Sequence, residues 1–112
     1  MKHYIFLLLL VAQCLIGKAQ SVTYETAPKK AKASFDKAID AARVYQHKTA
    51  IENLKEALKT APNFTDAYGQ MGICYIELKD YAAAKEAFEK LKQLDNEAIR
   101  IVMVPYSKAL AG

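Results

Sequence analysis

The chain has few of the residue types from which catalytic and metal centres are usually built. Its 112 residues include only two cysteines and two histidines. Cys14 lies in an apolar run near the start, and Cys74 lies between Ile73 and Tyr75. No second cysteine or histidine stands at metal-ligand spacing from Cys74, and a lone cysteine cannot form an internal disulfide. We therefore expect Cys74 to be a packed small apolar residue rather than a reactive thiol.

A catalytic constellation is also lacking. Beyond the start of the chain, His47 is the one histidine, and we expect it to be a solvated turn residue rather than a catalytic base. Two pairs at i, i+4 spacing, Glu52 with Glu56 and Glu86 with Lys90, are typical of a solvated helical surface. There is no glycine-rich phosphate-binding loop. The sequence therefore predicts a protein that is not an enzyme and that needs no cofactor and no metal ion.

The excess of one charge over the other is small. The formal net charge is +4, from 16 basic and 12 acidic residues. Removal of a leader that contains Lys2 and Lys18 would lower the net charge to +2. The densest basic cluster, formed by Lys29, Lys30 and Lys32, opens a predicted helix. We therefore expect no nucleic-acid partner and no preference for a membrane surface.

Residues 1–19 have the features of a secretory signal peptide. Lys2 and His3 precede an apolar run that starts at Tyr4, and the small residues Gly17 and Ala19 fit a cleavage site after Ala19. The run is shorter than the ~20 residues of a membrane span, although an uncleaved anchor remains the alternative. We predict export to the periplasm or the outer membrane, with no membrane span left after cleavage.

A second interpretation of this region is lipidation at Cys14. The stretch Val11–Cys14 has the outline of a bacterial lipobox, but Gln13 stands where a small residue is expected. We favour an ordinary cysteine within the apolar run, and the sequence leaves lipidation of Cys14 open.

The rest of the chain is organised by an internal repeat of 34 residues. At this offset the aligned pairs are Ala50 with Ala84, Leu54 with Phe88, Ala57 with Leu91, and Pro62 with Asn96. A period of 34 residues is typical of stacked helix–turn–helix units. Apolar residues recur every three or four positions, as on one face of a helix. Residues 20–30 precede this pattern, and we predict that they form a flexible leader.

The second unit carries a known motif. Tyr68-x2-Met71-Gly72-x2-Tyr75, followed by Ala84-x3-Phe88, resembles the tetratricopeptide repeat, whose pattern is W-x2-L-G-x2-Y…A-x3-F…P. In this sequence the family's Trp, Leu and Pro are replaced by Tyr68, Met71 and Asn96. The resemblance implies an all-α fold of tandem helix–turn–helix repeats that form a short right-handed α-solenoid. It assigns residues 31–64 to a first repeat and residues 65–98 to a second.

The first repeat matches the family mainly in its second half. In its first helix the family's Trp, Leu, Gly and Tyr are replaced by Ser34, Lys37, Ala38 and Ala41, respectively. An atypical helix of this kind is expected in a terminal repeat, which caps the stack.

Gly72 is expected to have a packing role. Glycine within a helix costs ~1 kcal/mol relative to alanine, so its presence calls for a compensating contact. Two helices of one hairpin approach closely only where the facing residues are small. We place this crossing at Gly72 and Ala84, with Tyr75 and Phe88 filling the wider gaps beside it.

The resemblance also implies a ligand groove, because the first helix of each hairpin lines the concave face in this family. Carried over to this sequence, the candidate groove residues are Lys32, Phe35, Ile39, Ala42, Arg43, Asp66, Gly69, Gln70, Ile73, Ile76 and Glu77. They lack the Lys/Asn pattern by which some members hold the carboxylate of a peptide. The apolar ones suit an extended or helical peptide with apolar anchors. The alternative is that these apolar residues pack against a neighbouring repeat.

Residues 99–112 are predicted to begin a third repeat. Pro105 within a helix would cost ~3 kcal/mol. Either a helix starts at Pro105, with Tyr106, Ala109 and Leu110 on its apolar side, or a short helix over 97–103 ends in a kink. In both cases the apolar run Ile99–Val104 would be left partly bare. If the chain is complete, this surface would be covered either by its partner or by a second copy of the chain in a homodimer.

Together these features predict a protein that binds other proteins. The leading hypothesis is an exported, non-enzymatic interaction module, a scaffold or assembly factor that holds a peptide or protein segment in its concave groove. The alternative is the N-terminal positioning domain of a larger envelope protein, with a peptidoglycan-binding or catalytic domain beyond residue 112. A looser similarity supports that alternative: the chain resembles the start of Gram-negative envelope proteins that continue into a β-propeller and an outer-membrane-protein-A-like domain.

Overall fold

Helices make up most of the chain in the computed structural model, which describes residues 21–100 and 103–112. Within these ranges the elements, in order, are α2 (Lys29–Arg43), α3 (His47–Thr60), α4 (Thr65–Glu77), α5 (Tyr81–Leu94), the 3-10 helix η1 (Ala98–Arg100) and α6 (Met103–Ala111). No β-strand forms in the same ranges. The predicted all-α fold of tandem helix–turn–helix units is confirmed. The predicted signal peptide, including Cys14, lies outside the described residues.

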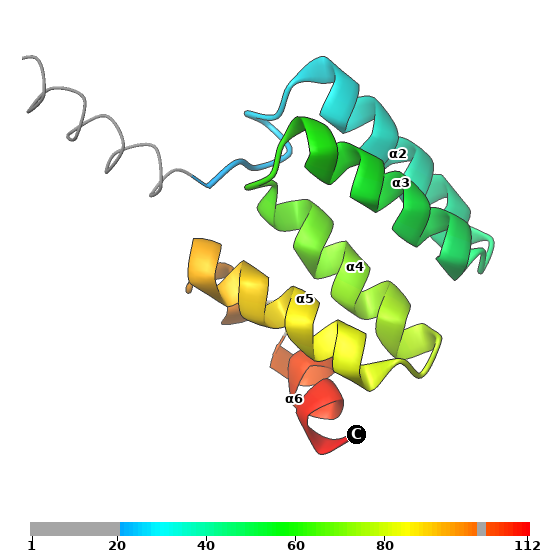
Figure 1. Cartoon of the computed structure of the whole chain (residues 1–112), viewed down its shortest axis with the longest axis vertical. Coiled ribbons are helices and arrows are strands. Elements are labelled where there is room, and N and C mark those ends of the chain that lie inside the picture. The colour runs from blue at the N-terminus through cyan, green and yellow to red at the C-terminus, as the bar shows by residue number, and fades with distance from the viewer. Residues whose placement is uncertain (1–20, 101–102) are drawn as a thin grey trace, which may run out of the picture.

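The helices pack as hairpins in chain order. Helix α2 lies against α3 and helix α4 against α5, while α3 packs on α4 and so joins the two hairpins. Figure 1 shows these four helices in one row, with α6 at the end of the row against α4 and α5. Each hairpin therefore buries apolar surface against the next one, as in other repeat proteins.

The 34-residue repeat of the sequence is also a repeat of buried positions. Ala50 in α3 and Ala84 in α5 are both fully buried, and so are their partners one turn further on, Leu54 and Phe88. The matched residues therefore have the same packing role in each hairpin, because each faces the first helix of its own unit.

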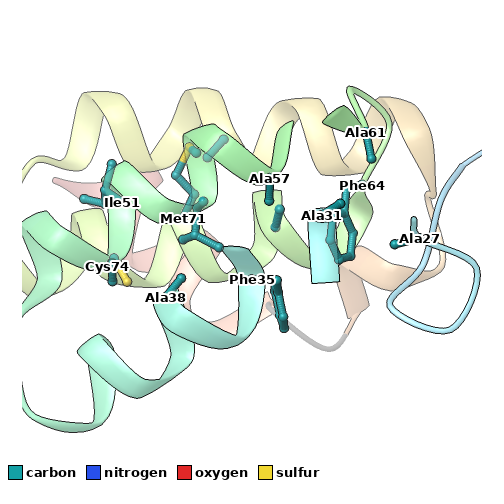
Figure 2. Packing of buried hydrophobic residues seen from close by; sticks show 14 of the residues in the cluster. Ala27, Ala31, Phe35, Ala38, Ile51, Ala57, Ala61, Phe64, Met71 and Cys74 are labelled. Atoms are coloured by element: carbon teal, nitrogen blue, oxygen red, sulfur yellow. The ribbon is translucent and has the colours of Figure 1, made fainter. Parts of the chain in front are cut away.

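Buried side chains form two apolar clusters. The first spans α2, α3 and the core face of α4, and Figure 2 shows its labelled members with Ile51 and Cys74 toward one end and Ala27 and Phe64 toward the other. The second cluster joins α4 and α5 to the C-terminal elements through Phe88, Ile99, Tyr106 and Ala109. Helix α6 is therefore attached to the second hairpin by its own apolar face.

The close approach predicted at Gly72 is present. A Cβ atom built on Gly72 would stand 2.5 Å from Cε1 and 2.5 Å from Cζ of Phe88, closer than real Cβ contacts allow. Ala84, on the facing helix, is fully buried. The glycine is thus explained by the ring of Phe88, which occupies the space that a side chain at position 72 would need.

Each hairpin turns through a residue with a positive φ. Tyr45 follows α2 with φ 62°, and Lys79 follows α4 with φ 61°. In the first turn the N–H of Tyr45 donates to the carbonyl of Ala42, and the next N–H donates to the carbonyl of Ala41. The second turn repeats the pattern, and both are helix C-terminal motifs in which glycine is the usual residue. The two turns lie one repeat apart.

The C-terminal segment combines the two alternatives expected from Pro105. A short 3-10 helix covers Ala98–Arg100, and α6 begins at Met103, so that Pro105 lies within its first turn. Proline is tolerated there because the first N–H groups of a helix have no intrahelical partner. Tyr106 and Ala109 are buried as expected, whereas Leu110 is exposed.

The segment before α2 differs from the flexible leader expected over residues 20–30. Val22 forms an isolated parallel bridge with Phe64. Its N–H donates to the carbonyl of Asn63 at 2.8 Å, and its carbonyl accepts from the N–H of Thr65 at 2.8 Å. These partners are more than 40 positions away in the chain, so no local pattern could have indicated them. The segment ties the start of the first hairpin to the start of the second.

Candidate functional site

Five of the predicted groove residues, Gly69 among them, line one pocket beside α4. The pocket has a volume of about 420 Å³, and Phe35 reaches it from α2 while Asp66, Gln70 and Ile73 reach it from α4. These α4 residues lie on one helical face, since they are spaced by three, four or seven positions. The structure thus brings together residues from the first helices of both predicted repeats.

A smaller pocket continues this hollow toward the C-terminal end of α4. It has a volume of about 210 Å³ and shares Ile73 and Pro105 with the larger one. Two further predicted residues, Ile76 and Glu77, line it. Because the two pockets share residues, they form one groove, which we call the α4 groove. Its floor is α4, and α6 contributes to the wall of both pockets.

The remaining four predicted residues line neither pocket; all are on α2, and they are Lys32, Ile39, Ala42 and Arg43. Lys32 lies with its Nζ 5.5 Å from the centre of the Tyr24 ring, and this amine donates to the carbonyl of Glu25 at 3.2 Å. Ile39 packs against the first apolar cluster. Arg43 lies at the end of α2, where its guanidinium is 3.6 Å from the carboxylate of Asp40 on an exposed surface. A pair exposed to this degree contributes little to stability.

Apolar members of the predicted set also serve as core. Phe35 is 9% exposed and Ile76 7% exposed, so most of each side chain is buried within the protein. The ring of Phe35 packs against that of Phe64, with centroids 5.2 Å apart. Ile73 is half-buried and packs against the second cluster. These apolar residues therefore pack between repeats and also line the edge of the pockets.

Sequence reasoning missed the residues that complete the walls. The larger pocket is also lined by Tyr24, by Leu91 of α5, by Ala98 of η1 and by Pro105 of α6. A signal for α6 was present, because the 34-residue offset carries Gln70 onto Val104, which lines the smaller pocket. No comparable signal existed for Tyr24, since it lies in a segment without periodicity.

Tyr24 is held in place by several contacts. Its N–H donates to Oδ2 of Asp66 at 2.6 Å, and its hydroxyl donates to the carboxylate of Asp36 at 3.0 Å. The ring lies against that of Phe35, with centroids 5.6 Å apart. The hydrogen bond to Asp36, together with partial burial and the negative charge of that carboxylate, raises the pKa of Tyr24 above its usual value. The phenol therefore stays protonated and continues to donate at neutral pH.

The groove carries both charges along its length. Asp36 and Asp66 stand near the Tyr24 end, where Lys32 is the nearby base. Glu77 and Lys108 line the smaller pocket at the other end. A ligand that follows the groove therefore meets hydrogen-bond acceptors at one end, an apolar middle around Ile73, and one group of each charge at the other end.

A third pocket, of about 560 Å³, lies on the opposite face of α4. Its lining includes Tyr68, Met71 and Tyr75, which are about half a helical turn away from Asp66 and Ile73. The hydroxyl of Tyr68 donates to the carbonyl of Pro62 at 3.0 Å, so this ring is fixed by the protein itself. No predicted site residue lines this pocket. It contains one base, Lys90, beside two glutamates and a glutamine of α5.

Cys74 and His47 take positions that suit packing rather than chemistry. Cys74 is 2% exposed, and burial together with the negative charge of Glu77 raises the pKa of its thiol. His47, expected to be a solvated turn residue, is instead the first residue of α3 and is half-buried. Its Nδ1 atom is buried and has no hydrogen-bond partner among the described residues. The ring meets that of Tyr45 edge-on, with centroids 6.2 Å apart.

Residues 21–100 and 103–112 contain neither a metal-ligand cluster nor a membrane-spanning helix. No group of three or more His, Cys, Asp or Glu residues in these ranges could hold a metal ion. Over the same part of the chain, no helix is both long enough and apolar enough to cross a membrane.

A comparison with protein families bears directly on the repeat. The tetratricopeptide repeat family matches residues 41–103, which is more than half of the chain. The chain belongs to the tetratricopeptide repeat family. The match begins at Ala41, near the end of α2, as expected from the departures of that helix from the motif. Among curated proteins, none matches the chain. Tetratricopeptide repeats generally mediate protein–protein interactions, so the expected class of partner is a protein.

Proposed function

We propose that this tetratricopeptide repeat protein is an exported, non-enzymatic interaction module that binds a peptide or protein segment in the α4 groove. The observation that carries the proposal is the pocket of about 420 Å³ in which Phe35 of α2 meets Asp66, Gln70 and Ile73 of α4. It combines apolar surface with a few polar groups, as ligand sites usually do. Its floor belongs to the first helix of the second repeat, and α6 and η1 close one side.

The shape of the groove favours an extended segment with an apolar anchor. The larger pocket would accept one large side chain beside Ile73 and Leu91, and Asp66 and Gln70 would orient the adjacent backbone. The smaller pocket, between Glu77 and Lys108, would accept the next anchor along the segment. Binding of this kind needs no bond making or breaking, so the protein would act as a scaffold or an assembly factor.

Site-specific photocrosslinking from two glutamines tests the groove. A photoreactive residue at Gln70 would face the groove, whereas the same residue at Gln93 would face the pocket on the other side of α4. We expect a partner to crosslink from position 70 and not from position 93. The substitution Ile73→Asp should abolish this crosslink while the helical circular dichroism signal is retained. Equal crosslinking from both positions, or a crosslink that survives Ile73→Asp, would place the partner elsewhere.

Export is proposed from the first 19 residues of the sequence and is tested separately. We expect the mature protein from a Gram-negative host to begin at Gln20, as determined by mass spectrometry of its N-terminus, and to be recovered with the periplasmic or outer-membrane fraction. An intact N-terminus on a cytoplasmic protein would contradict export. The same spectrum would show a lipid at Cys14 if that cysteine, rather than Ala19, marked the processing site.

A second candidate function is that of a positioning domain within a larger envelope protein, and one observation favours it. Val104 is 80% exposed and Leu110 52% exposed, both on α6. In a longer repeat array these exposed side chains of α6 would be covered by following helices, since each unit buries its neighbour's apolar face. A second copy of the chain would cover it equally well. Reading the gene beyond the Gly112 codon, together with the mass of the protein in solution, separates these arrangements.

A further inference from the structure

The end of the α4 groove nearest Phe35 is already filled by the chain itself. Phe35, Asp66 and Lys32, which the family resemblance assigned to ligand binding, all contact residues 22–25 instead. Phe35 packs against the ring of Tyr24, Asp66 accepts from the N–H of Tyr24, and Lys32 donates to the carbonyl of Glu25. This segment, which we call the N-terminal strap, occupies the site in the way that a bound peptide would.

The contacts of the strap separate into general and selective ones. The general contacts are made by its backbone: Val22 exchanges hydrogen bonds with Asn63 and Thr65, and the hydroxyl of Thr65 also donates to the carbonyl of Val22 at 3.1 Å. Backbone pairing of this kind holds the chain at Val22 whatever its side chains are. After Val22 the strap turns, because the N–H groups of Thr26 and Ala27 both donate to the carbonyl of Thr23. The selective contacts come from Tyr24, whose ring meets Phe35 and whose hydroxyl donates to Asp36. The selective contacts are thus made by one side chain, Tyr24, which lies in the turn that follows Val22.

We propose that the N-terminal strap is an intramolecular stand-in for the protein's ligand. The partner would present a short segment whose backbone pairs as that of Val22 does, followed by a turn with a tyrosine that takes the place of Tyr24. The inference rests on the function proposed above and names the class of peptide. The ligand would carry an aliphatic residue two positions before its tyrosine, matching Val22 and Tyr24. Its tyrosine must be unphosphorylated, because the carboxylate of Asp36 accepts a hydrogen bond at that point and would repel a phosphate.

Displacement of the strap by such a peptide is feasible on structural grounds. Tyr24 remains 39% exposed, and its hydrogen bonds to Asp36 and Asp66 are at the surface. A tethered segment competes at an effective concentration of the order of millimolar. A partner must therefore either exceed this concentration locally or add contacts in the rest of the groove, beside Gln70 and Ile73, which the strap leaves open. By this competition the strap would prevent the binding of short peptides that have a low affinity for the groove.

The experiment uses the synthetic peptide Ser-Val-Thr-Tyr-Glu-Thr-Ala, which repeats residues 21–27. Isotopically labelled protein is titrated with this peptide, and the amide resonances of Phe35, Asp66 and Gln70 are followed by NMR. We expect the Tyr24→Ala protein to bind the peptide at least about tenfold more tightly than the wild type, because the tethered competitor is weakened. A peptide with alanine or phosphotyrosine at the tyrosine position should cause no shift in either protein.

Tyr45→Ala is the matched control. Tyr45 is 83% exposed and lies in the turn after α2, away from the α4 groove, so this variant should bind the peptide as weakly as the wild type. If Tyr24→Ala fails to fold, Tyr24→Phe removes only the hydroxyl that meets Asp36. Its affinity for the peptide should lie above that of the wild type.

Each contrary outcome overturns the inference in its own way. A folded Tyr24→Ala protein that shows no shift with the peptide means that the groove does not recognise this sequence. Equal binding by wild type and variant means that the strap does not occlude the site. A wild-type dimer that becomes a monomer in Tyr24→Ala means that the segment is exchanged between two copies. If the peptide fails while crosslinking from Gln70 persists, the groove remains a binding site for another kind of ligand; loss of both would remove the proposed function as well.

Discussion

The ring of Phe88 lies over the backbone of Gly72 so closely that no side chain fits between them. Two ring carbons stand 2.5 Å from the place where a Cβ on Gly72 would be. Phe88 is completely buried, so a displaced ring would have to move against other core side chains. This contact joins α4 to α5 at the centre of the second hairpin, and it explains why a residue with a poor helix propensity lies in the middle of a helix.

The first prediction concerns this contact. Gly72→Ala should destabilise the protein by up to about 2 kcal/mol, because overpacking a core costs about 1–3 kcal/mol against the ~1 kcal/mol gained in helix propensity. The measurement is urea unfolding followed by circular dichroism at 222 nm. In a Phe88→Leu background the same substitution should be neutral or stabilising, since the ring is gone. An equal loss in both backgrounds would show that the two residues are not coupled.

The second prediction concerns the two turns with positive φ. Replacing Tyr45 or Lys79 by glycine should stabilise the protein by about 1 kcal/mol at each position. The left-handed conformation costs a non-glycine residue roughly 1–2 kcal/mol. Glycine avoids this cost, but part of the gain is lost because glycine loses more conformational entropy on folding. Tyr45→Ala and Lys79→Ala are the controls, and neither should be stabilising. Thermal unfolding of the four variants measures the effect. A gain from alanine equal to that from glycine would mean that the side chain, and not φ, is responsible.

The third prediction concerns alkaline pH. Hydrogen bonds to Asp36 and Glu89 raise the pKa of Tyr24 and of Tyr106, so each phenol holds its proton more tightly in the folded protein than in the unfolded chain. The stability they contribute is complete below the usual tyrosine pKa of about 10 and is lost as the pH rises through the higher folded-state pKa values. The urea concentration at the unfolding midpoint should therefore decrease as the pH is raised above about 10, where tyrosine ionises.

Phenylalanine variants supply the controls for this pH dependence. Tyr24→Phe and Tyr106→Phe should each reduce the alkaline loss, because a phenyl ring does not ionise. Burial also raises the pKa of Tyr68, so part of the loss should persist in the double variant. A wild-type midpoint that stays constant from pH 8 to pH 11 would contradict the role of these hydroxyls as donors.

The fourth prediction concerns Cys74. Because burial and the charge of Glu77 raise the pKa of its thiol, little thiolate is present at pH 8 and the sulfur is shielded. Since only the thiolate reacts, a disulfide reagent should modify the folded protein at least about tenfold more slowly than the same protein in urea. The rate is read from the absorbance of the released thiol. A folded-state rate equal to that in urea would show that α4 opens freely at this point.

Sequence periodicity was sufficient for the repeat and its core, but not for contacts made outside the repeat. Gly72, Ala84 and Phe88 are recognisable because their spacing recurs and their chemistry has a single packing explanation. The helix bounds near Pro105 were left with two alternatives, since a proline is compatible both with a helix start and with a kink. The structure resolves this by placing Pro105 in the first turn of α6.

The candidate site was predicted unevenly for the same reason. Residues of α4 such as Gln70 and Ile73 follow from the motif and do line the groove. Arg43 follows from the same rule but lies at the end of α2, where no pocket forms around it. Tyr24 was missed because its partners, Asp36 and Asp66, are 12 and 42 positions away. Contacts between residues so far apart in the chain are determined by the fold, not by local sequence.

The bridge between Val22 and Phe64 has a consequence for how the chain folds. In most repeat proteins each unit touches only its neighbours, so hairpins can form and open one after another from either end. Here the first residues of the described chain are fastened only once Asn63, Phe64 and Thr65 have taken their places. The bridge therefore adds a contact between the start of the chain and the start of the second hairpin, beyond the packing of α3 on α4. The two repeats should melt in a single transition, although the architecture by itself would permit two.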